Sequence, residues 1–167
     1  MKNFKKLLAT AIVAISGFAS AASFLMTVPV GLSASTYHSL ALVYAQQAES
    51  TYSVAFSDLP LWNEALAHAA AAVNLEPNSA EYNLTAAKLF AQAQWWQPAH
   101  QYFAAANRLE PLGFVTRQLA AITARKLAYM AIQRGDRAEA TNYLVESLRY
   151  EETAATRAML DKLQTAL

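Results

Sequence analysis

The stretch that decides the fold is AEYNLTAAKLFAQAQWWQPAHQYFAAANRLEPLG, residues 80–113. Its tripeptide Leu109-Glu110-Pro111 repeats Leu75-Glu76-Pro77, which lies 34 residues earlier. The same step separates three further pairs of identical residues: Trp62 and Trp96, Ala65 and Ala99, and Ala72 and Ala106. A fixed step of this length is typical of a repeated helix–turn–helix unit. The sequence therefore predicts that this stretch folds as one of several stacked pairs of helices.

The repeat resembles the tetratricopeptide repeat (TPR) family, and residues 80–113 carry the resemblance best. The matching positions are the late aromatic residue of the first helix, the small–aromatic–small face of the second helix and the closing proline: Phe90, Ala99, Phe103, Ala106 and Pro111. The unit departs from the family pattern at Asn83, where Trp is usual, and at Ala87, where Gly is usual. Looser units are expected at residues 46–79 and 121–154.

Composition favours a helical fold independently of the resemblance. The 167 residues are 55% hydrophobic and 15% charged, with four glycines and five prolines, which argues against disorder and for packed helices. We expect an all-α chain with one N-terminal transmembrane helix, then a short TPR-like solenoid of helix–turn–helix units. Residues 153–167 are expected to form a C-terminal capping helix, with one apolar face for the last unit and one polar face for water.

Residues 7–28 are uncharged and mostly apolar, and Lys2, Lys5 and Lys6 precede them. About 20 apolar residues span a bilayer core, so residues 1–32 are predicted to be a short cytoplasmic stub and a transmembrane helix. The positive-inside rule places the N-terminus in the cytoplasm. The repeat domain, residues 33–167, would then lie on the periplasmic or lumenal side of an inner or equivalent membrane. Gly17 and Ala21 form a small-xxx-small pair that predicts helix packing in the membrane.

The same N-terminal stretch also matches a cleavable signal peptide. Under this interpretation the lysines form the basic region, and Ala19-Ser20-Ala21 is the cleavage site. Both interpretations send the repeat domain across the membrane, and they differ in whether it remains anchored there.

The sequence gives no indication of catalysis. It has no cysteine, and its three histidines, His38, His68 and His100, have no further metal ligands at matched spacing. No nucleophile-elbow, phosphate-loop or zinc-protease motif occurs. We therefore expect a protein that is not an enzyme, with no metal, cofactor or small-molecule substrate, and the net charge of +1 gives no reason to expect nucleic acid.

The TPR resemblance implies a concave groove lined by the first helix of each unit. Carried onto this sequence, the groove would contain eight residues: Glu81, Leu84, Lys88 and Gln92 from the second unit, and Ile122, Arg125, Tyr129 and Gln133 from the third. Trp62 and Trp96 match a packing position of the family. Trp95 has no counterpart in the first unit and is predicted to be an exposed contact residue.

These features predict a membrane-anchored module for protein–protein interaction, which acts by binding only. Its role would be that of an accessory, assembly or scaffold subunit of a larger respiratory, photosynthetic or envelope membrane complex. Its partners would be protein subunits of that complex, and membrane lipid around the N-terminal helix. Two alternatives remain open: a cleaved soluble periplasmic adaptor or chaperone, and a self-assembling structural subunit of a filament.

Overall fold

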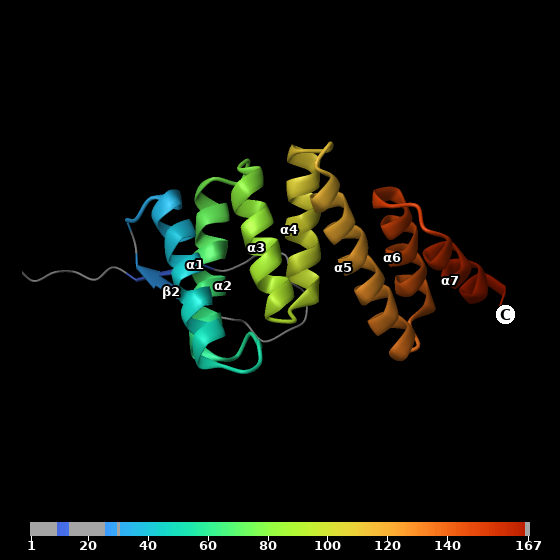
Figure 1. Cartoon of the computed structure of the whole chain (residues 1–167), viewed down its shortest axis with the longest axis horizontal. Coiled ribbons are helices and arrows are strands. Elements are labelled where there is room, and N and C mark those ends of the chain that lie inside the picture. Colours follow the sequence, from blue (N-terminus) through green and yellow to red (C-terminus); the bar gives the residue numbers. More distant parts are fainter. Residues whose placement is uncertain (1–9, 14–25, 30, 166–167) are drawn as a thin grey trace, which may run out of the picture.

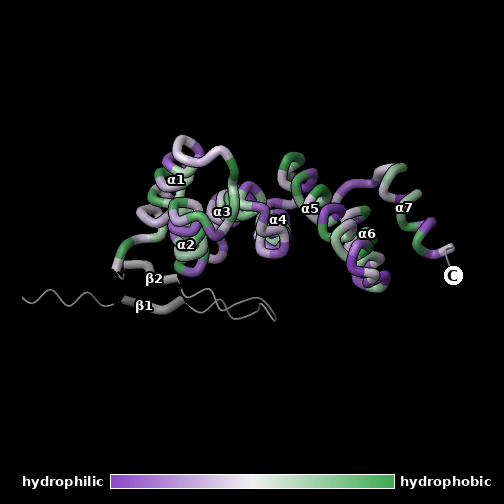
Figure 2. The backbone as a smooth tube through the Cα atoms, turned by 90° about the horizontal axis from the view of Figure 1, so that it is seen from below, coloured by the Kyte–Doolittle hydropathy of each residue, from purple (hydrophilic) through white to green (hydrophobic). Residues whose placement is uncertain are grey.

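A computed structural model describes residues 10–13, 26–29 and 31–165, the strands as backbone only. Residues 34–165 form a row of seven helices: α1 (Ala34–Thr51), α2 (Pro60–Leu75), α3 (Ala80–Gln92), α4 (Trp96–Leu109), α5 (Phe114–Gln133), α6 (Arg137–Tyr150) and α7 (Ala154–Thr165). They pack as the pairs α1/α2, α3/α4 and α5/α6, and α7 packs on α6 (Figure 1). The helices follow one another in chain order from one end of the molecule to the other in both views (Figures 1 and 2). This part of the chain is therefore an all-α solenoid with a terminal capping helix.

Small residues make close contact between the helices possible. In α2, six alanines are buried: Ala65, Ala67, Ala69, Ala70, Ala71 and Ala72. Alanine loses no side-chain entropy in a helix and keeps neighbouring backbones close. The largest fully buried side chains, Trp62, Phe90 and Phe103, fill the spaces between these contacts. The core is thus continuous from α1 to the start of α5.

Short polar side chains cap the starts of α1, α3 and α6. The Ser33 and Ser79 hydroxyls accept hydrogen bonds from the backbone N–H groups of Thr36 and Tyr82, each at 3.2 Å. Asp136 accepts from the N–H of Glu139 at 2.9 Å. Each cap satisfies an N–H group that has no partner within its own helix, so these residues fix where α1, α3 and α6 begin.

The prediction of a single-pass membrane protein is wrong. Two parts of the predicted span, β1 (Thr10–Val13) and β2 (Met26–Pro29), are antiparallel paired strands, and β2 packs beside α2 (Figure 2). Among the residues that the structure describes, no helix is both long and apolar enough to cross a membrane. β-Branched residues such as Ile12, Val13 and Val28 favour the extended backbone seen here.

Two N-terminal features lie outside the described residues. They are the Gly17 and Ala21 pair, predicted to pack in a membrane, and the cleavage site at Ala19-Ser20-Ala21. Cleavage at that site stays a prediction.

Asn83 shows how the chain adapts to a departure from the TPR pattern. Its side chain is buried, and its Nδ2 group donates to the carbonyl oxygens of Pro77 and Ser79, at 2.9 and 2.8 Å. Both carbonyls belong to the turn between α2 and α3. An amide therefore secures this turn by hydrogen bonds at a position where the family uses an aromatic ring for packing.

We expect Asn83→Ala to lower the free energy of unfolding by about 1–3 kcal/mol, because two carbonyl oxygens lose their donor. Urea unfolding followed by circular dichroism measures this loss. The control is Asn78→Ala in the same turn, where the side chain is exposed and a change of no more than about 0.5 kcal/mol is expected. Equal effects of the two variants would contradict the role given to Asn83.

Candidate functional site

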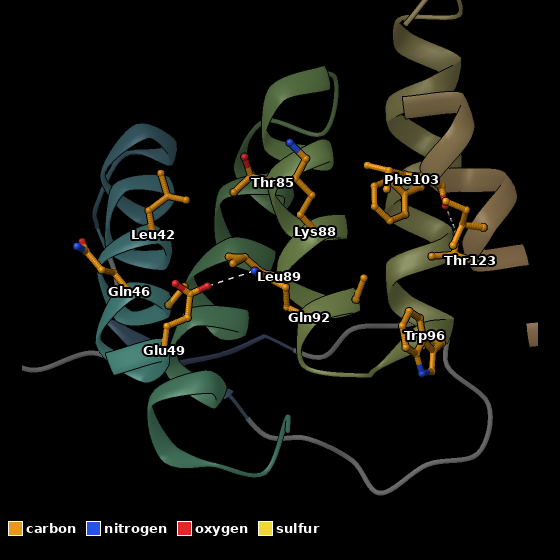
Figure 3. A pocket seen from close by; sticks show the side chains of 14 residues that line it. Leu42, Gln46, Glu49, Thr85, Lys88, Leu89, Gln92, Trp96, Phe103 and Thr123 are labelled. Atoms are coloured by element: carbon orange, nitrogen blue, oxygen red, sulfur yellow. Dashed lines mark hydrogen bonds between the residues drawn. The ribbon is translucent and has the colours of Figure 1, made fainter. Parts of the chain in front are cut away.

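A groove of about 730 Å³ crosses one face of the solenoid (Figure 3). It is lined by α1, α3, α4 and α5, and mainly by apolar residues: Leu42, Ala45, Leu89, Ala91, Trp96, Phe103, Leu119 and Ile122. Its polar residues are Gln46, Glu49, Thr85, Lys88, Gln92 and Thr123. The groove therefore joins all three helix pairs through one largely apolar surface.

Helical periodicity explains which residues reach the groove. On α1, and on α3 apart from Ala91, the lining residues follow the steps i, i+3, i+4 and i+7, which place them on one face of each helix: Leu42, Ala45, Gln46 and Glu49, and Thr85, Lys88, Leu89 and Gln92. The buried Phe103 of α4 also lines the groove. Leu42 and Ile122 expose 47% and 43% of their surface on opposite sides of the groove. These side chains present apolar surface that a partner can cover.

Two polar features interrupt the apolar lining. The Nε2 group of Gln92 donates to the Oε1 atom of Glu49 at 3.2 Å, which links α3 to α1 at one end of the groove (Figure 3). The Lys88 ammonium has no ion pair with any residue that the structure describes. Both charges of the groove, Glu49 and Lys88, therefore remain open to a ligand.

Only some of the eight predicted groove residues lie in the groove. Lys88, Gln92 and Ile122 line it, whereas the other five are not among its lining residues: Glu81, Leu84, Arg125, Tyr129 and Gln133. The guanidinium of Arg125 instead lies 3.5 Å from a carboxylate oxygen of Glu151 and 3.4 Å from the Ser147 hydroxyl. Tyr129 is half exposed on α5. A role for these five side chains in binding stays a prediction.

The two adjacent tryptophans have different surroundings. Trp95 is half-buried, with its ring centroid 5.5 Å from that of Phe90. Trp96, the first residue of α4, lines the groove, and the Lys126 ammonium lies 5.3 Å from the centre of its ring. Trp62 is fully buried. Of the three, Trp96 is therefore the one that the groove offers to a ligand.

The groove residues on α1 were missed because of an irregular connection. The turn between α3 and α4 has three residues, 93–95, but the connection between α1 and α2 has eight, 52–59. The residue 34 positions before Lys88 is Val54, which lies in this longer connection and not on α1. The alternation of apolar and polar residues along α1 itself would have predicted that Leu42 and Glu49 lie in the groove.

The histidines have structural surroundings. His68 is buried between the rings of Tyr37 and Tyr44, at centroid distances of 5.8 and 5.2 Å. His38 Nε2 lies 3.0 Å from the hydroxyl of Thr85. In the part of the chain that the structure describes, no group of three His, Cys, Asp or Glu side chains is placed to hold a metal ion. None of the three histidines lines the groove.

The surroundings of two groups change their proton affinity, by burial for His68 and by a hydrogen bond for Glu146. It lowers the pKa of the His68 imidazole, and the Glu64 carboxylate, 3.8 Å away, opposes this shift. The hydrogen bond from His100, at 3.1 Å, lowers the pKa of the Glu146 carboxyl against the opposing effect of burial. These contacts join neighbouring turns or helices and lie away from the groove, so they belong to the stability of the fold.

Comparison with known proteins gives a fold but no close relative. No known protein family matches the sequence, and neither does any curated protein. Among solved structures, the N-terminal domain of stress-induced protein-1 (STI-1) from C. elegans aligns with a TM-score of 0.50 and 14% identity, over 79% of this chain and 94% of that domain.

Two further similar structures have lower TM-scores. The first TPR of Spaghetti (RPAP3) bound to an HSP90 peptide gives a TM-score of 0.45 and 15% identity, over 80% of this chain and 91% of that one. The type III secretion chaperone SycD of Yersinia enterocolitica in complex with a peptide of the translocator YopD gives 0.43 and 14%, over 78% and 91%. The predicted resemblance to TPR domains is confirmed at the level of the fold.

Replacing His68 tests the effect of its burial on pH dependence. Because its pKa in the folded chain is below the ordinary 6.5, His68 contributes stability above pH 6.5, which is lost as the pH falls through the folded pKa. His68→Phe keeps an aromatic ring between Tyr37 and Tyr44 but removes the imidazole group that binds a proton. We expect the variant to lose less unfolding free energy than the wild type between about pH 7 and pH 5, as measured by urea unfolding. His38→Phe is the control, and an unchanged pH slope in His68→Phe would contradict the assignment.

Proposed function

We propose that this chain is a protein-binding module that holds an apolar segment of a partner in the groove formed by α1, α3, α4 and α5. It acts by binding alone, as an adaptor or chaperone. The observation that carries the proposal is the groove itself, whose apolar lining continues across three helix pairs. Solenoids commonly use such concave surfaces to bind other proteins.

The chemistry of the groove supports binding over catalysis. Its two charged residues, Glu49 and Lys88, come from different helices, and its other polar residues are two glutamines and two threonines. No histidine is present to transfer a proton at neutral pH. Apolar surface for affinity, with a few polar groups for orientation, is the usual composition of a binding site.

An adaptor or chaperone role has more support than a role as an anchored subunit of a membrane complex. The anchored role depended on a transmembrane helix, which the described residues do not contain. The groove, in contrast, belongs entirely to α1, α3, α4 and α5 and needs no anchor to form.

A matched pair of variants on α1 tests the groove. Leu42 and Val43 are adjacent and each exposes 47% of its surface, but only Leu42 lines the groove. Peptides selected from a random phage-displayed library on the full chain supply the ligand, and fluorescence anisotropy gives its Kd. Leu42→Lys is expected to weaken binding at least about tenfold, because it puts a charge among apolar contacts, and Val43→Lys to change it by less than about twofold.

Circular dichroism checks that both variants keep the helical fold. Equal losses in the two variants would show that the selected peptides bind elsewhere and would overturn the proposal. The same conclusion follows if Leu42→Lys binds as tightly as the wild type.

A further inference from the structure

The turn between α4 and α5, together with the first two residues of α5, forms an exposed apolar tip at one end of these helices, residues 110–115 (Figure 1). Three of its side chains are exposed to solvent: Leu112 by 92% of its surface, Phe114 by 64% and Val115 by 57%. A single exposed apolar side chain is ordinary, but neighbouring ones on one turn mark an interaction surface. The tip therefore needs a partner that covers it.

The corresponding turns of the solenoid are polar. Asn78, in the turn between α2 and α3, is exposed and lies 34 residues before Leu112. In the turn before α7, the Thr153 hydroxyl accepts a hydrogen bond from the backbone N–H of Thr156 at 3.2 Å. The helical fold thus forms such turns from polar residues, and the apolar side chains of the tip are not a requirement of the repeat.

The tip also leaves the start of α5 without two common sources of stability. α3 begins with a cap from the Ser79 hydroxyl and has Glu81 in its first turn. α5 begins after Gly113, with no side-chain cap and no acidic residue in its first turn. A cap and an acidic residue both stabilise a helix N-terminus. The residues of the tip are therefore better explained by binding than by the stability of α5.

The tip cannot fold into the groove of its own chain. The N–H of Gly113 donates to the carbonyl oxygen of Glu110, and the N–H of Arg117 donates to that of Gly113, each at 3.1 Å. These bonds close the turn tightly. The helices on both sides of it, α4 and α5, are themselves walls of the groove. A groove that receives this tip therefore belongs to another molecule.

The groove and the tip have complementary chemistry. The groove is lined mainly by apolar residues, and its Lys88 ammonium has no ion pair among the described residues. Glu110 of the tip is exposed and likewise has no ion pair there. Arg108 and Arg117 flank the tip, and residues 31–87, which include the α1 wall of the groove, contain no Lys or Arg to repel them. Opposite charges across a contact fix its orientation.

We propose that the tip of one copy of this chain docks in the groove of a second copy. Leu112 and Phe114 lie against the apolar lining, and Glu110 lies beside Lys88. One contact thereby covers both exposed apolar surfaces. The inference rests on the proposed function in that it names an occupant of the same groove, and self-docking competes there with the segment of a partner.

Sedimentation velocity of the full chain between about 5 and 500 µM measures self-association. The double variant Leu112→Asn with Phe114→Ala gives the tip the residues of the corresponding turn, Asn78 and Ala80. We expect it to weaken self-association at least about tenfold, because apolar contacts are lost. Leu75→Asn is the control: Leu75 is 55% exposed but lies outside the tip and the groove, and a change below about twofold is expected.

Mixing two defective variants distinguishes docking in the groove from contact between two tips. Leu42→Lys keeps the tip but alters the groove, whereas the double tip variant keeps the groove, so each alone self-associates weakly. We expect the mixture to associate at least about tenfold more tightly than either variant alone, because an intact tip then meets an intact groove. A fluorophore on one variant allows this to be measured by anisotropy. Contact between two tips gives no such rescue.

A charge exchange tests the predicted orientation. Lys88→Glu and Glu110→Lys are each expected to weaken self-association about fivefold, and their combination in one chain to restore most of the loss. Glu76→Lys changes the exposed carboxylate of the corresponding turn and is expected not to rescue Lys88→Glu. Equal rescue by both lysine substitutions would contradict the pairing of Glu110 with Lys88.

Two results would overturn the proposal: a wild-type chain that stays monomeric over the whole concentration range, and a mixture of the two variants that shows no rescue. If Leu42→Lys still weakens peptide binding in either case, the groove keeps its proposed function and only self-docking is lost. If Leu42→Lys changes neither peptide binding nor self-association, the groove itself is not a binding surface and both proposals fail.

Discussion

Close packing through alanine is the constraint on which the rest of this structure depends. On α1, Ala41, Ala45 and Ala48 are buried, while the neighbouring Leu42 and Glu49 point into the groove. On α5, the buried Ala120 and Ala124 flank the exposed Ile122 in the same manner. Where the helices approach one another through small side chains, Leu42 of α1 and Ile122 of α5 project from the other face. The same pattern that closes the core therefore leaves a continuous apolar surface outside it.

The connection between α1 and α2 is the main irregularity of the solenoid. It is longer than the connections within the other two helix pairs. Residues 52–59 are too long to be a simple turn, and Tyr52, Ala55 and Leu59 from this segment pack on the core. The segment thereby covers the end of α1 and the start of α2, where Trp62 lies, and it forms most of the wall of a cavity of about 250 Å³. The connection that weakens the sequence repeat thus adds a small cavity beside the groove.

The sequence predicts the regular part of this architecture and fails where local pattern does not determine the outcome. Phe90, Ala99 and Phe103 lie in the core, as the repeat pattern predicts, because periodic contacts between helices force the same residue types into the same positions. The N-terminal stretch was predicted to be a helix because it is long, uncharged and apolar, but those properties also suit paired strands. The choice between Trp95 and Trp96 depends on where α4 begins: Trp95 is the residue before the helix and Trp96 its first residue. Repeat spacing does not fix a helix start to within one residue.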